Sequence, residues 1–572
     1  MSLLERRLRW QQMQKQIDPR PALKVAVLAT FTANPLEPYL GTALAGADLP
    51  PVIFTGPYNQ VAQECLADQS ETARFRPDVL LVWPRLEDLW SGRPWPLTDP
   101  SAAPIREAVE LAETCLDAAR RWGATLLFVL PAIPDLRPLG VGDISMVTGV
   151  AATATAVREA LRQRLAGQKG ALLADAEEAV RQVGTGKAFD PRKMALARIP
   201  YSEELLQSVG DQAARIITLS RRAARKVVVV DADNTLWGGV VGEDGPDGVK
   251  LGDNGPGEAY RDFQSYLLEL RRSGVLLALA SKNQESDVQM VFRRREMRLK
   301  QEHLAAMRVG WQPKSVSIRE MAEELQLGLD AFVLIDDSPA EVAEVSSSLP
   351  QVACIRFPAD PAEWLAAVAG SGLLDRLPPT AEDLQRAGFY QQERERNLVL
   401  AAAASPEEYR AQLGVAVEVF APASGDMARF AQLVAKTNQF NLNCRRRSES
   451  ELAALCADPD YVVRLVQARD RYGDYGIVGA MVARVEGGQA ELDTFLLSCR
   501  AMGRGVEEAM LAGLREELDR RGVTELHATV LQCPRNEPAY RFFGPLGCAR
   551  YGEPAVLPRI DWPAYVGRLQ PV

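Results

Sequence analysis

Short runs of apolar residues, many of them β-branched, recur along the chain and end in polar or charged residues. The most marked run is 227–230, four consecutive valines followed directly by Asp231. Such a run predicts a strand that is buried on both faces, as in a parallel sheet. Segments 274–283 and 331–339 have the same pattern and end in Ser-Lys-Asn and Asp-Asp-Ser-Pro. We therefore expect an α/β sheet here, with polar residues gathered at the carboxyl ends of its strands.

The first 220 residues show a similar alternation of apolar runs and amphipathic stretches. Residues 104–123 carry the helical pattern and separate two of the apolar runs. Strands that alternate with helices predict a second parallel α/β sheet. The predicted strands are 23–31, 51–56, 78–84 and 124–133.

The last part of the chain carries a different signal. A predicted strand, 489–498, is followed by the glycine-rich stretch 499–505, a helical stretch and another predicted strand, 523–531. A glycine-rich loop that opens a helix can present backbone N–H groups to a phosphate. The residues of this predicted cradle are Arg500, Gly503, Arg504 and Gly505. Residues 470–476 are typical of a hairpin between two strands.

Taken together, these patterns predict an α/β chain of three domains joined by one linker. The domains are 1–220, 221–375 and 406–572, and residues 376–405 form a charged helical linker. The only insert after the first acidic motif is 238–257, which is too short for a large cap domain. Its glycines and aspartates favour a β-hairpin flap over the pocket.

The residues at the predicted strand ends point to phosphoryl chemistry. Asp231 can attack phosphorus as a nucleophile, and Asp233 can exchange the proton. Two carboxylates in one turn need a counter-charge, most simply Mg²⁺, which prefers oxygen ligands. The predicted metal ligands are Asp231, Asp233, Asp336 and Asp337. The predicted phosphate-binding residues are Thr235, Ser281, Lys282, Asn283 and Lys314.

The composition limits the classes of molecule that the chain is expected to bind. The net charge of −9 argues against nucleic acid or an anionic membrane as the main partner. Eight cysteines without a CxxC pair, and only two histidines, indicate reduced thiols in a cytoplasmic protein and no zinc site. No apolar stretch has the length of a membrane span. Residues 1–220 contain no histidine, so no Ser-His-Asp site can form within them, and a scaffold or docking role is favoured there.

The order Asp-x-Asp-x-Thr, Ser, Lys, Asp-Asp resembles that of the haloacid dehalogenase (HAD) superfamily of phosphotransferases. Within it, 231–245, 263–264, 281–283, 309–311 and 335–341 resemble the FkbH-like branch. The resemblance implies an enzyme that takes 1,3-bisphosphoglycerate, an acyl phosphate, and removes phosphate. It also implies transfer of the glyceryl unit to the phosphopantetheine thiol of an acyl carrier protein for polyketide biosynthesis.

The flanks carry resemblances of their own. Segment 489–505, followed by 536–548, is similar to the GNAT acyltransferase fold, whose glycine-rich loop holds pantetheine. The resemblance assigns Arg500, Gly503, Arg504 and Gly505 to that role. Residues 31–40 match a recurring segment of the first domain of FkbH-like proteins, which is similar to SGNH-hydrolase or flavodoxin-like domains.

Two cysteines are candidates to carry the acyl group. Cys499 precedes the glycine-rich loop beside Arg500, where a thiolate would be favoured. Cys444, in the polar segment 438–447, is the alternative. Two other functions remain open at this point: a Mg²⁺-dependent phosphatase of small molecules whose flanks are scaffold, and a non-catalytic adaptor of polyketide assembly.

Overall fold

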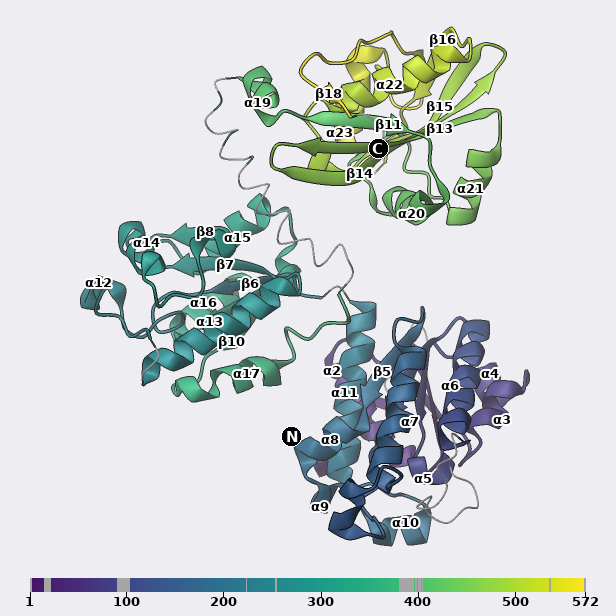
Figure 1. The fold of residues 1–572 in the computed structure, drawn as a ribbon, viewed down its shortest axis with the longest axis vertical. Helices are drawn as coiled ribbons and strands as arrows, with labels where there is room; N and C mark the ends of the chain where they lie inside the picture. Colours follow the sequence, from purple (N-terminus) through teal and green to yellow (C-terminus); the bar gives the residue numbers. More distant parts are fainter. Residues whose placement is uncertain are drawn as a thin grey trace. The chain divides into compact units, whose positions relative to one another are not determined.

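The computed structural model describes residues 3–14, 22–89, 103–222, 224–252, 255–379, 396, 399, 403, 405–533 and 536–569. They form three separate β-sheets with flanking helices (Figure 1). Each of the three predicted domains contains one sheet, whereas most of the predicted helical linker lies outside the described residues. The boundaries drawn between the domains stay predictions. In the described part of the chain, no helix has the length and apolarity that crossing a membrane would require.

The first sheet has five strands in the order β2-β1-β3-β4-β5, and all neighbouring pairs are parallel. The four predicted strands are confirmed, and the helix predicted at 104–123 is α6. The short fifth strand was not predicted. The strands are β1 (Leu23–Ala29), β2 (Pro51–Thr55), β3 (Val79–Trp83), β4 (Thr125–Leu130) and β5 (Ala171–Asp175).

Helices cover both faces of this sheet because successive strand residues point to opposite sides. Val25 and Val27 belong to one buried cluster, with residues of α2, α8 and α11. Ala26 and Leu28 belong to another, with residues of α3, α6 and α7. The helices of this part are α1 (Leu3–Gln14), α2 (Glu37–Gly46), α3 (Val61–Leu66), α4 (Glu71–Phe75), α5 (Leu86–Leu89), α6 (Ala103–Trp122), α7 (Val150–Leu165), α8 (Ala176–Val183), α9 (Thr185–Ala188), α10 (Pro191–Ala197) and α11 (Glu203–Arg221).

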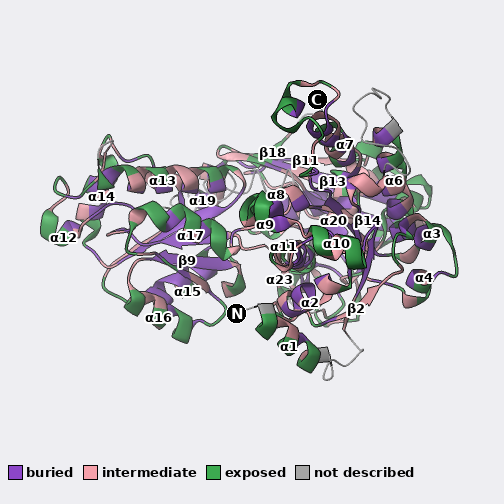
Figure 2. Cartoon of the chain, turned by 90° about the horizontal axis from the view of Figure 1, so that it is seen from below, coloured by how far each residue is buried: buried purple, intermediate pink, exposed green. Residues whose placement is uncertain are grey.

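The central sheet has the order β10-β9-β6-β7-β8, with parallel pairing between β10 and β9, β6 and β7, and β7 and β8. The run of four valines is β6, and all four residues are fully buried, as predicted. The strands are β6 (Val227–Val230), β7 (Leu276–Ser281), β8 (Leu304–Val309), β9 (Phe332–Asp336) and β10 (Ala353–Arg356). The helices are α12 (Val241–Asp244), α13 (Pro256–Arg272), α14 (Glu285–Arg293), α15 (Lys314–Glu324), α16 (Pro339–Ser348) and α17 (Trp364–Ser371). Figure 2 shows buried β9 in purple and the exposed turn of α12 in green.

The predicted hairpin flap over 238–257 is wrong for the described residues of this insert. They form the short helix α12 and a single antiparallel bridge between Gly238 and Lys250. The carboxylate of Asp244 accepts the N–H of Val240, and that of Asp233 accepts the N–H of Val241. These carboxylates bond the backbone N–H groups that would otherwise need a partner on a second strand.

The third sheet is mostly antiparallel, but β15 is parallel to β16 and β11 is parallel to β18. The predicted strands 489–498 and 523–531 are β15 and β16, the predicted helix is α22, and the predicted hairpin joins β13 to β14. The strands are β11 (Ala416–Phe420), β12 (Phe440–Asn441), β13 (Tyr461–Asp470), β14 (Gly473–Glu486), β15 (Gln489–Leu497), β16 (Glu525–Thr529), β17 (Pro554–Val556) and β18 (Gly567–Arg568). The helices are α19 (Pro406–Leu413), α20 (Met427–Lys436), α21 (Glu449–Ala457), α22 (Val506–Arg520) and α23 (Glu537–Phe543).

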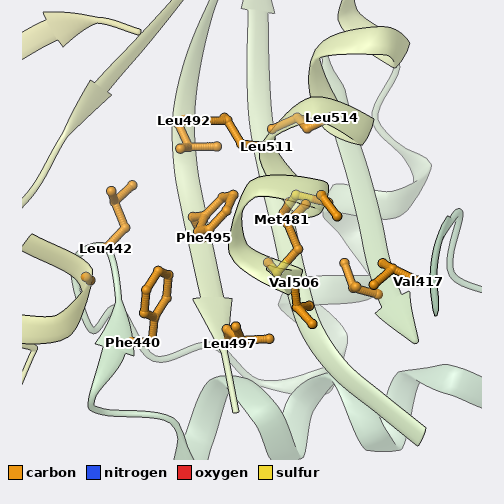
Figure 3. Packing of buried hydrophobic residues seen from close by; sticks show 14 of the residues in the cluster. Val417, Phe440, Leu442, Met481, Leu492, Phe495, Leu497, Val506, Leu511 and Leu514 are labelled. Atoms are coloured by element: carbon orange, nitrogen blue, oxygen red, sulfur yellow. The ribbon is translucent and has the colours of Figure 1, made fainter. Parts of the chain in front are cut away.

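The two-residue strand β12 pairs with the carboxyl end of β15. The pairing of β15 with β16 ends at Leu492, and beyond it Leu497 and Leu496 of β15 pair with β12 instead. Just past β12, the carbonyl of Leu442 accepts the N–H of Leu531. Figure 3 shows the side chains of Phe440 and Leu442 lying with the core residues of β15. Segment 440–442 therefore lies where β15 and β16 part.

Candidate functional site

The central sheet brings its polar residues together at the carboxyl ends of its strands, as expected for an open α/β sheet. Asp231 follows β6, Ser281 ends β7, and Asp336 ends β9. Carboxylate oxygens of Asp231, Asp336 and Asp337 lie within 4.8 Å of one another. Asp231 and Asp336 are buried, so their negative charges need a counter-charge. Three convergent carboxylates are a donor set that suits a hard divalent cation.

A lysine supplies part of that counter-charge. Nζ of Lys314 lies 2.9 Å from Oδ1 of Asp231, and both side chains are largely buried. Lys314 is the first residue of α15, directly after Pro313. The sequence prediction that places Lys314 opposite the acidic turn therefore agrees with the geometry. The arrangement presents an ammonium group and metal-binding carboxylates around the nucleophile candidate.

The carboxylate of Asp233 is not part of this acidic group. Its Oδ1 accepts hydrogen bonds from Nε1 of Trp237 at 2.8 Å and from the backbone N–H of Val241 at 3.1 Å. Its Oδ2 accepts one from Nδ2 of Asn283 at 2.9 Å. Asn234, directly after Asp233, has a left-handed backbone with φ of 51°, and its side chain accepts the N–H of Gly239. The prediction that the Asp233 carboxylate binds the metal is not supported by this placement, whereas a role in proton exchange is compatible with it.

Ser281 and Asn283 form one continuous hydrogen-bonded set with Asp233. The amide of Asn283 donates to Oγ of Ser281 at 3.0 Å as well as to Asp233, and both Ser281 and Asn283 are buried. Lys282, between them, is half-buried. The strand end after β7 is therefore held in a fixed relation to the acidic turn, as the predicted phosphate-binding role requires.

Thr235 provides an independent sign that the turn is built around a bound group. Its side chain is fully buried, and its Oγ1 has no hydrogen-bond partner among the described residues. A buried hydroxyl without a partner is uncommon in proteins and is often satisfied by a ligand or an ion. The hydroxyl therefore fits the predicted phosphate-binding role of Thr235.

Two residues that support the turn had no assigned role in the sequence prediction. Trp237 donates to Asp233, and Gln264 of α13 is completely buried. The Gln264 amide donates to the carbonyl of Leu236 at 2.7 Å and accepts the N–H groups of Arg298 and Leu299. Gln264 could have been identified from the sequence, because it is a polar residue on the apolar face of a helix.

In the C-terminal part, Cys499 is exposed and begins a 3₁₀ turn that includes Arg500. Helix α22 begins at Val506, seven residues beyond Cys499. Gly503 and Gly505 both have positive φ values, 74° and 85°. A side chain at Gly505 would strike the ring of Tyr565, because a Cβ there would lie 2.5 Å from it. The two glycines therefore have physical reasons for their positions in the loop.

Arg504 departs from its predicted role in this loop. Its guanidinium donates to Oη of Tyr475 at 2.7 Å and also to the carbonyl of Arg500. Tyr475 in turn donates to Asp470 at 2.5 Å, and Asp470 forms an ion pair with Arg396 at 2.7 Å. Arg504 is buried in this network and serves the packing of the loop, instead of lying on its open side.

Cys444, the alternative thiol, has the wrong electrostatics for a nucleophile at neutral pH. Burial, followed by the hydrogen bond with Cys533, raises the pKa of the Cys444 thiol to about 12. A thiol in that state is almost entirely protonated near pH 7 and reacts slowly. The backbone N–H of Cys444 donates to Oδ1 of Asn441, which is also buried, so the segment is structurally pinned. Of the two candidates, Cys499 is the accessible one.

The arginines next to Cys444 are also largely committed to internal contacts. Arg447 pairs with Asp493 at 2.7 Å, with 7% of its side chain exposed, and Arg446 donates to the carbonyl of Val434. Arg445 pairs with Asp493 as well, at 3.1 Å, but its side chain is 63% exposed. Arg445 and Arg446 are exposed, whereas Arg447 is half-buried.

Glu507, in the first turn of α22, has a strongly perturbed acidity. It is buried, its Oε1 accepts the N–H of Gly503 at 2.5 Å, and its Oε2 has no partner among the described residues. Burial raises the pKa of Glu507 to about 7, while hydrogen bonds from the backbone of Gly503 and Glu507 act in the opposite direction. Nothing in the sequence pattern marked this residue.

The raised pKa of Glu507 predicts a pH-dependent stability. The folded chain holds a proton that the unfolded chain loses near its ordinary pKa of 4.5, so stability falls as the pH rises from 4.5 to about 7 and is level above that. We expect Glu507→Gln to remove this loss, which is on the order of 3 kcal/mol for a buried group shifted this far. Thermal unfolding of both proteins between about pH 5 and about pH 8 would measure it. A difference between them that is the same at every pH would contradict the assignment.

The comparisons with known proteins bear on the fold. No protein-family model matches the chain, and no curated protein matches it significantly. Among solved structures, the chain is similar to the N-terminal part of the protein BF1531 from Bacteroides fragilis, which contains a phosphatase domain and was crystallised in complex with Mg. The identity is 23%, the match covers 64% of this chain and 98% of that chain, and the TM-score is 0.55. The matched part therefore shares its fold with that fragment.

Two acetyltransferase structures are matched over smaller parts. They are the ribosomal-protein-S18-alanine N-acetyltransferase from Escherichia coli and the PaiA N-acetyltransferase from Thermoplasma acidophilum in complex with coenzyme A. The identities are 19% and 12%, the matches cover 23% and 25% of this chain and 76% and 97% of those chains, and the TM-scores are 0.19 and 0.20. Scores this low decide nothing about the fold of the C-terminal part.

Proposed function

We propose that this chain is a phosphatase and acyltransferase of the FkbH-like type within the HAD superfamily. It removes phosphate from 1,3-bisphosphoglycerate and transfers the glyceryl unit to the phosphopantetheine thiol of an acyl carrier protein. The observation that carries the proposal is the convergence of Asp231, Asp336 and Asp337 within 4.8 Å, with Lys314 at 2.9 Å from Asp231. This is the arrangement that in-line attack on a phosphoryl group needs.

The residues that would hold a magnesium ion are Asp231, Asp336 and Asp337. Their donors are all carboxylate oxygens, and the orphaned hydroxyl of Thr235 leaves a further polar atom unsatisfied nearby in the chain. When bound, the ion would neutralise charge on the phosphoryl oxygens of the substrate. A phosphatase domain complexed with Mg is described for the similar structure from Bacteroides fragilis, which supports the same ion here.

The chain's own residues perform the phosphate chemistry in two steps. An oxygen of Asp231 forms a bond to the ester phosphorus while the bond to the glyceryl oxygen breaks, and Asp233 gives that oxygen its proton. Asp233 then takes a proton from water, whose oxygen attacks phosphorus and releases inorganic phosphate and free Asp231. Lys314 offsets negative charge on the phosphoryl group throughout. Trp237, Asn283 and the backbone of Val241 fix the orientation of Asp233.

The acyl end of the substrate is already activated as an acyl phosphate. The thiolate of Cys499 bonds to the acyl carbon and phosphate leaves. The sulfur of the pantetheine thiol then bonds to the same carbon and gives its proton to water, while the bond to Cys499 breaks and Cys499 leaves as a thiolate. Its exposure beside the glycine-rich loop, in contrast to Cys444, supports Cys499 as the carrier. The transfer needs no ATP, and either order of dephosphorylation and transfer is compatible with this scheme.

The test is to incubate the full chain with Mg²⁺, freshly made 1,3-bisphosphoglycerate and a phosphopantetheinylated carrier protein, and to measure the intact mass of the carrier. A glyceryl adduct that lacks phosphate supports the proposal, and Cys499→Ala should abolish it whereas Cys456→Ala, a second exposed cysteine, should not. Free phosphate with an unmodified carrier would instead indicate a small-molecule phosphatase. If neither phosphate nor a glyceryl adduct forms, the chain is an adaptor and the proposal is overturned.

Metal dependence gives a separate prediction. Phosphate release should stop with a chelator and return with Mg²⁺, and Asp336→Asn should raise the Mg²⁺ concentration needed for half-maximal release by about 10- to 100-fold. The matched control is Asp262→Asn on α13, where the aspartate side chain is 56% exposed. A Mg²⁺ titration of phosphate release measures the effect. Equal Mg²⁺ requirements for Asp336→Asn and the unaltered protein would rule out Asp336 as a ligand.

A further inference from the structure

The glycine-rich loop before α22 is already filled by a negative side chain of the protein. The N–H of Gly503, one of the groups that a bound phosphate would require, donates to Oε1 of Glu507 at 2.5 Å. The Glu507 side chain is 6% exposed, and Oε2 has no hydrogen-bond partner among the described residues. The loop therefore holds a carboxylate at the place where the sequence predicts a phosphate.

The charges around Glu507 make this place unfavourable for a second anion. Glu508 follows on the same helix and adds negative charge. Arg410 of α19 is a cation that acts on Glu507, and its guanidinium also donates to Oη of Tyr565 at 3.2 Å. Tyr565 lies against Gly505, where a side chain would collide with it. An incoming phosphate would meet the carboxylates of Glu507 and Glu508, and it would have to displace the bond between Glu507 and Gly503.

We propose that Glu507 is a specificity-determining residue that excludes thiols carrying a diphosphate, such as free coenzyme A, from this loop. The inference rests on the proposed transfer of an acyl group to a pantetheine thiol. On a carrier protein the pantetheine arm ends in one phosphodiester attached to the carrier, so no phosphate has to enter the loop. In free coenzyme A the same arm ends in a nucleoside diphosphate, whose charges Glu507 repels. The residue thus selects the carrier-bound arm over the free cofactor.

Protonation should relieve the exclusion, because neutral Glu507 neither repels an anion nor holds the Gly503 N–H as firmly. The raised pKa of Glu507, about 7, places this change near neutral pH. Coenzyme A should therefore bind more tightly below that pH than above it. Glu507→Gln, which keeps the size and an acceptor oxygen but removes the charge, should bind coenzyme A with about the same affinity on both sides of pH 7.

The experiment is calorimetric titration of the full-length protein with coenzyme A at about pH 6 and about pH 8. At the higher pH we expect Glu507→Gln to bind coenzyme A about 10-fold more tightly than the unaltered protein, which corresponds to about 1.4 kcal/mol, because the substitution removes a like charge from the loop. The matched control, Glu508→Gln, removes the same charge from the same helical turn but leaves the Gly503 contact, and it should retain the pH dependence of the unaltered protein.

Two results would overturn the inference: Glu507→Gln with no gain in affinity for coenzyme A, or an equal gain in Glu508→Gln. Far-ultraviolet circular dichroism and the melting temperature establish that each variant is folded. Binding is measured without catalysis, so the outcome is independent of Cys499 and of the central site. If the carrier protein is never loaded but Glu507→Gln gains affinity, the proposed function fails and the role of Glu507 in excluding diphosphates stands.

Discussion

Asp231→Asn is expected to lower phosphate release by about 10⁴-fold, because an amide oxygen cannot form the covalent phosphoryl bond. The substitution keeps the volume of the side chain, so the buried site can remain filled. The measurement is the rate of inorganic phosphate release from 1,3-bisphosphoglycerate at saturating Mg²⁺. Turnover near the level of the unaltered protein would exclude Asp231 as the nucleophile.

Asp233→Asn is the informative control for that experiment. Its carboxylate lies apart from the acidic group and is held by Trp237 and Asn283. Loss of proton exchange should slow the reaction by about 10²- to 10⁴-fold. A phosphorylated protein should be trapped in the mass spectrum of this variant when hydrolysis is the slower step, and never in that of Asp231→Asn. Phosphorylation of the Asp231 variant would contradict the division of roles.

Lys314→Met is expected to affect both catalysis and stability. The methionine nearly preserves the length of the side chain but removes the ammonium group 2.9 Å from Asp231. Loss of one partner from a buried ion pair costs about 3–5 kcal/mol, and loss of a charge facing the phosphoryl group should lower the rate about 10²- to 10³-fold. Added Mg²⁺ should restore part of the stability, because it binds the folded acidic group.

Thermal unfolding with and without Mg²⁺, together with phosphate release, measures both effects of Lys314→Met. Lys282→Met is the matched control, since Lys282 is half-buried at a neighbouring strand end. It should lose less stability than Lys314→Met. Equal losses of stability in the two variants would show that the ion pair of Lys314 with Asp231 contributes nothing extra to the free energy of unfolding.

The hydrophobic pattern was enough to predict the strands that build the central site. A run such as Val227–Val230 is compatible with burial on both sides, and parallel strands end at a common edge, so the positions of Asp231, Ser281 and Asp336 followed from the pattern. The orientation of individual side chains did not follow. Asp233 is two residues from Asp231, yet its carboxylate accepts hydrogen bonds from Trp237 and Asn283 instead of joining the acidic group.

The C-terminal loop shows the same limit more strongly. The sequence pattern identified its glycines. The structure explains them, because positive φ values and a close approach to Tyr565 favour glycine. The inward direction of Arg504 depends on Tyr475 and Asp470, which are distant in sequence, and the contact of Glu507 with Gly503 depends on the exact path of the loop. Local sequence patterns do not predict contacts between residues that are distant in sequence. The same holds for α12, where two aspartates complete the backbone hydrogen bonds that a predicted hairpin would have made.

The short strand β12 has a consequence for the folding kinetics of the C-terminal part. The Asn536 amide donates to the carbonyl of Asn441, which is 95 residues away in sequence. Contacts between such distant residues pay their loop-closure entropy before they contribute stability, so they form late. Segment 440–442 pairs with β15 and also contacts the region that follows β16, so its full set of contacts forms only when both are in place. We therefore expect closure of this sheet to be among the last steps of folding, later than the local hairpin of β13 and β14.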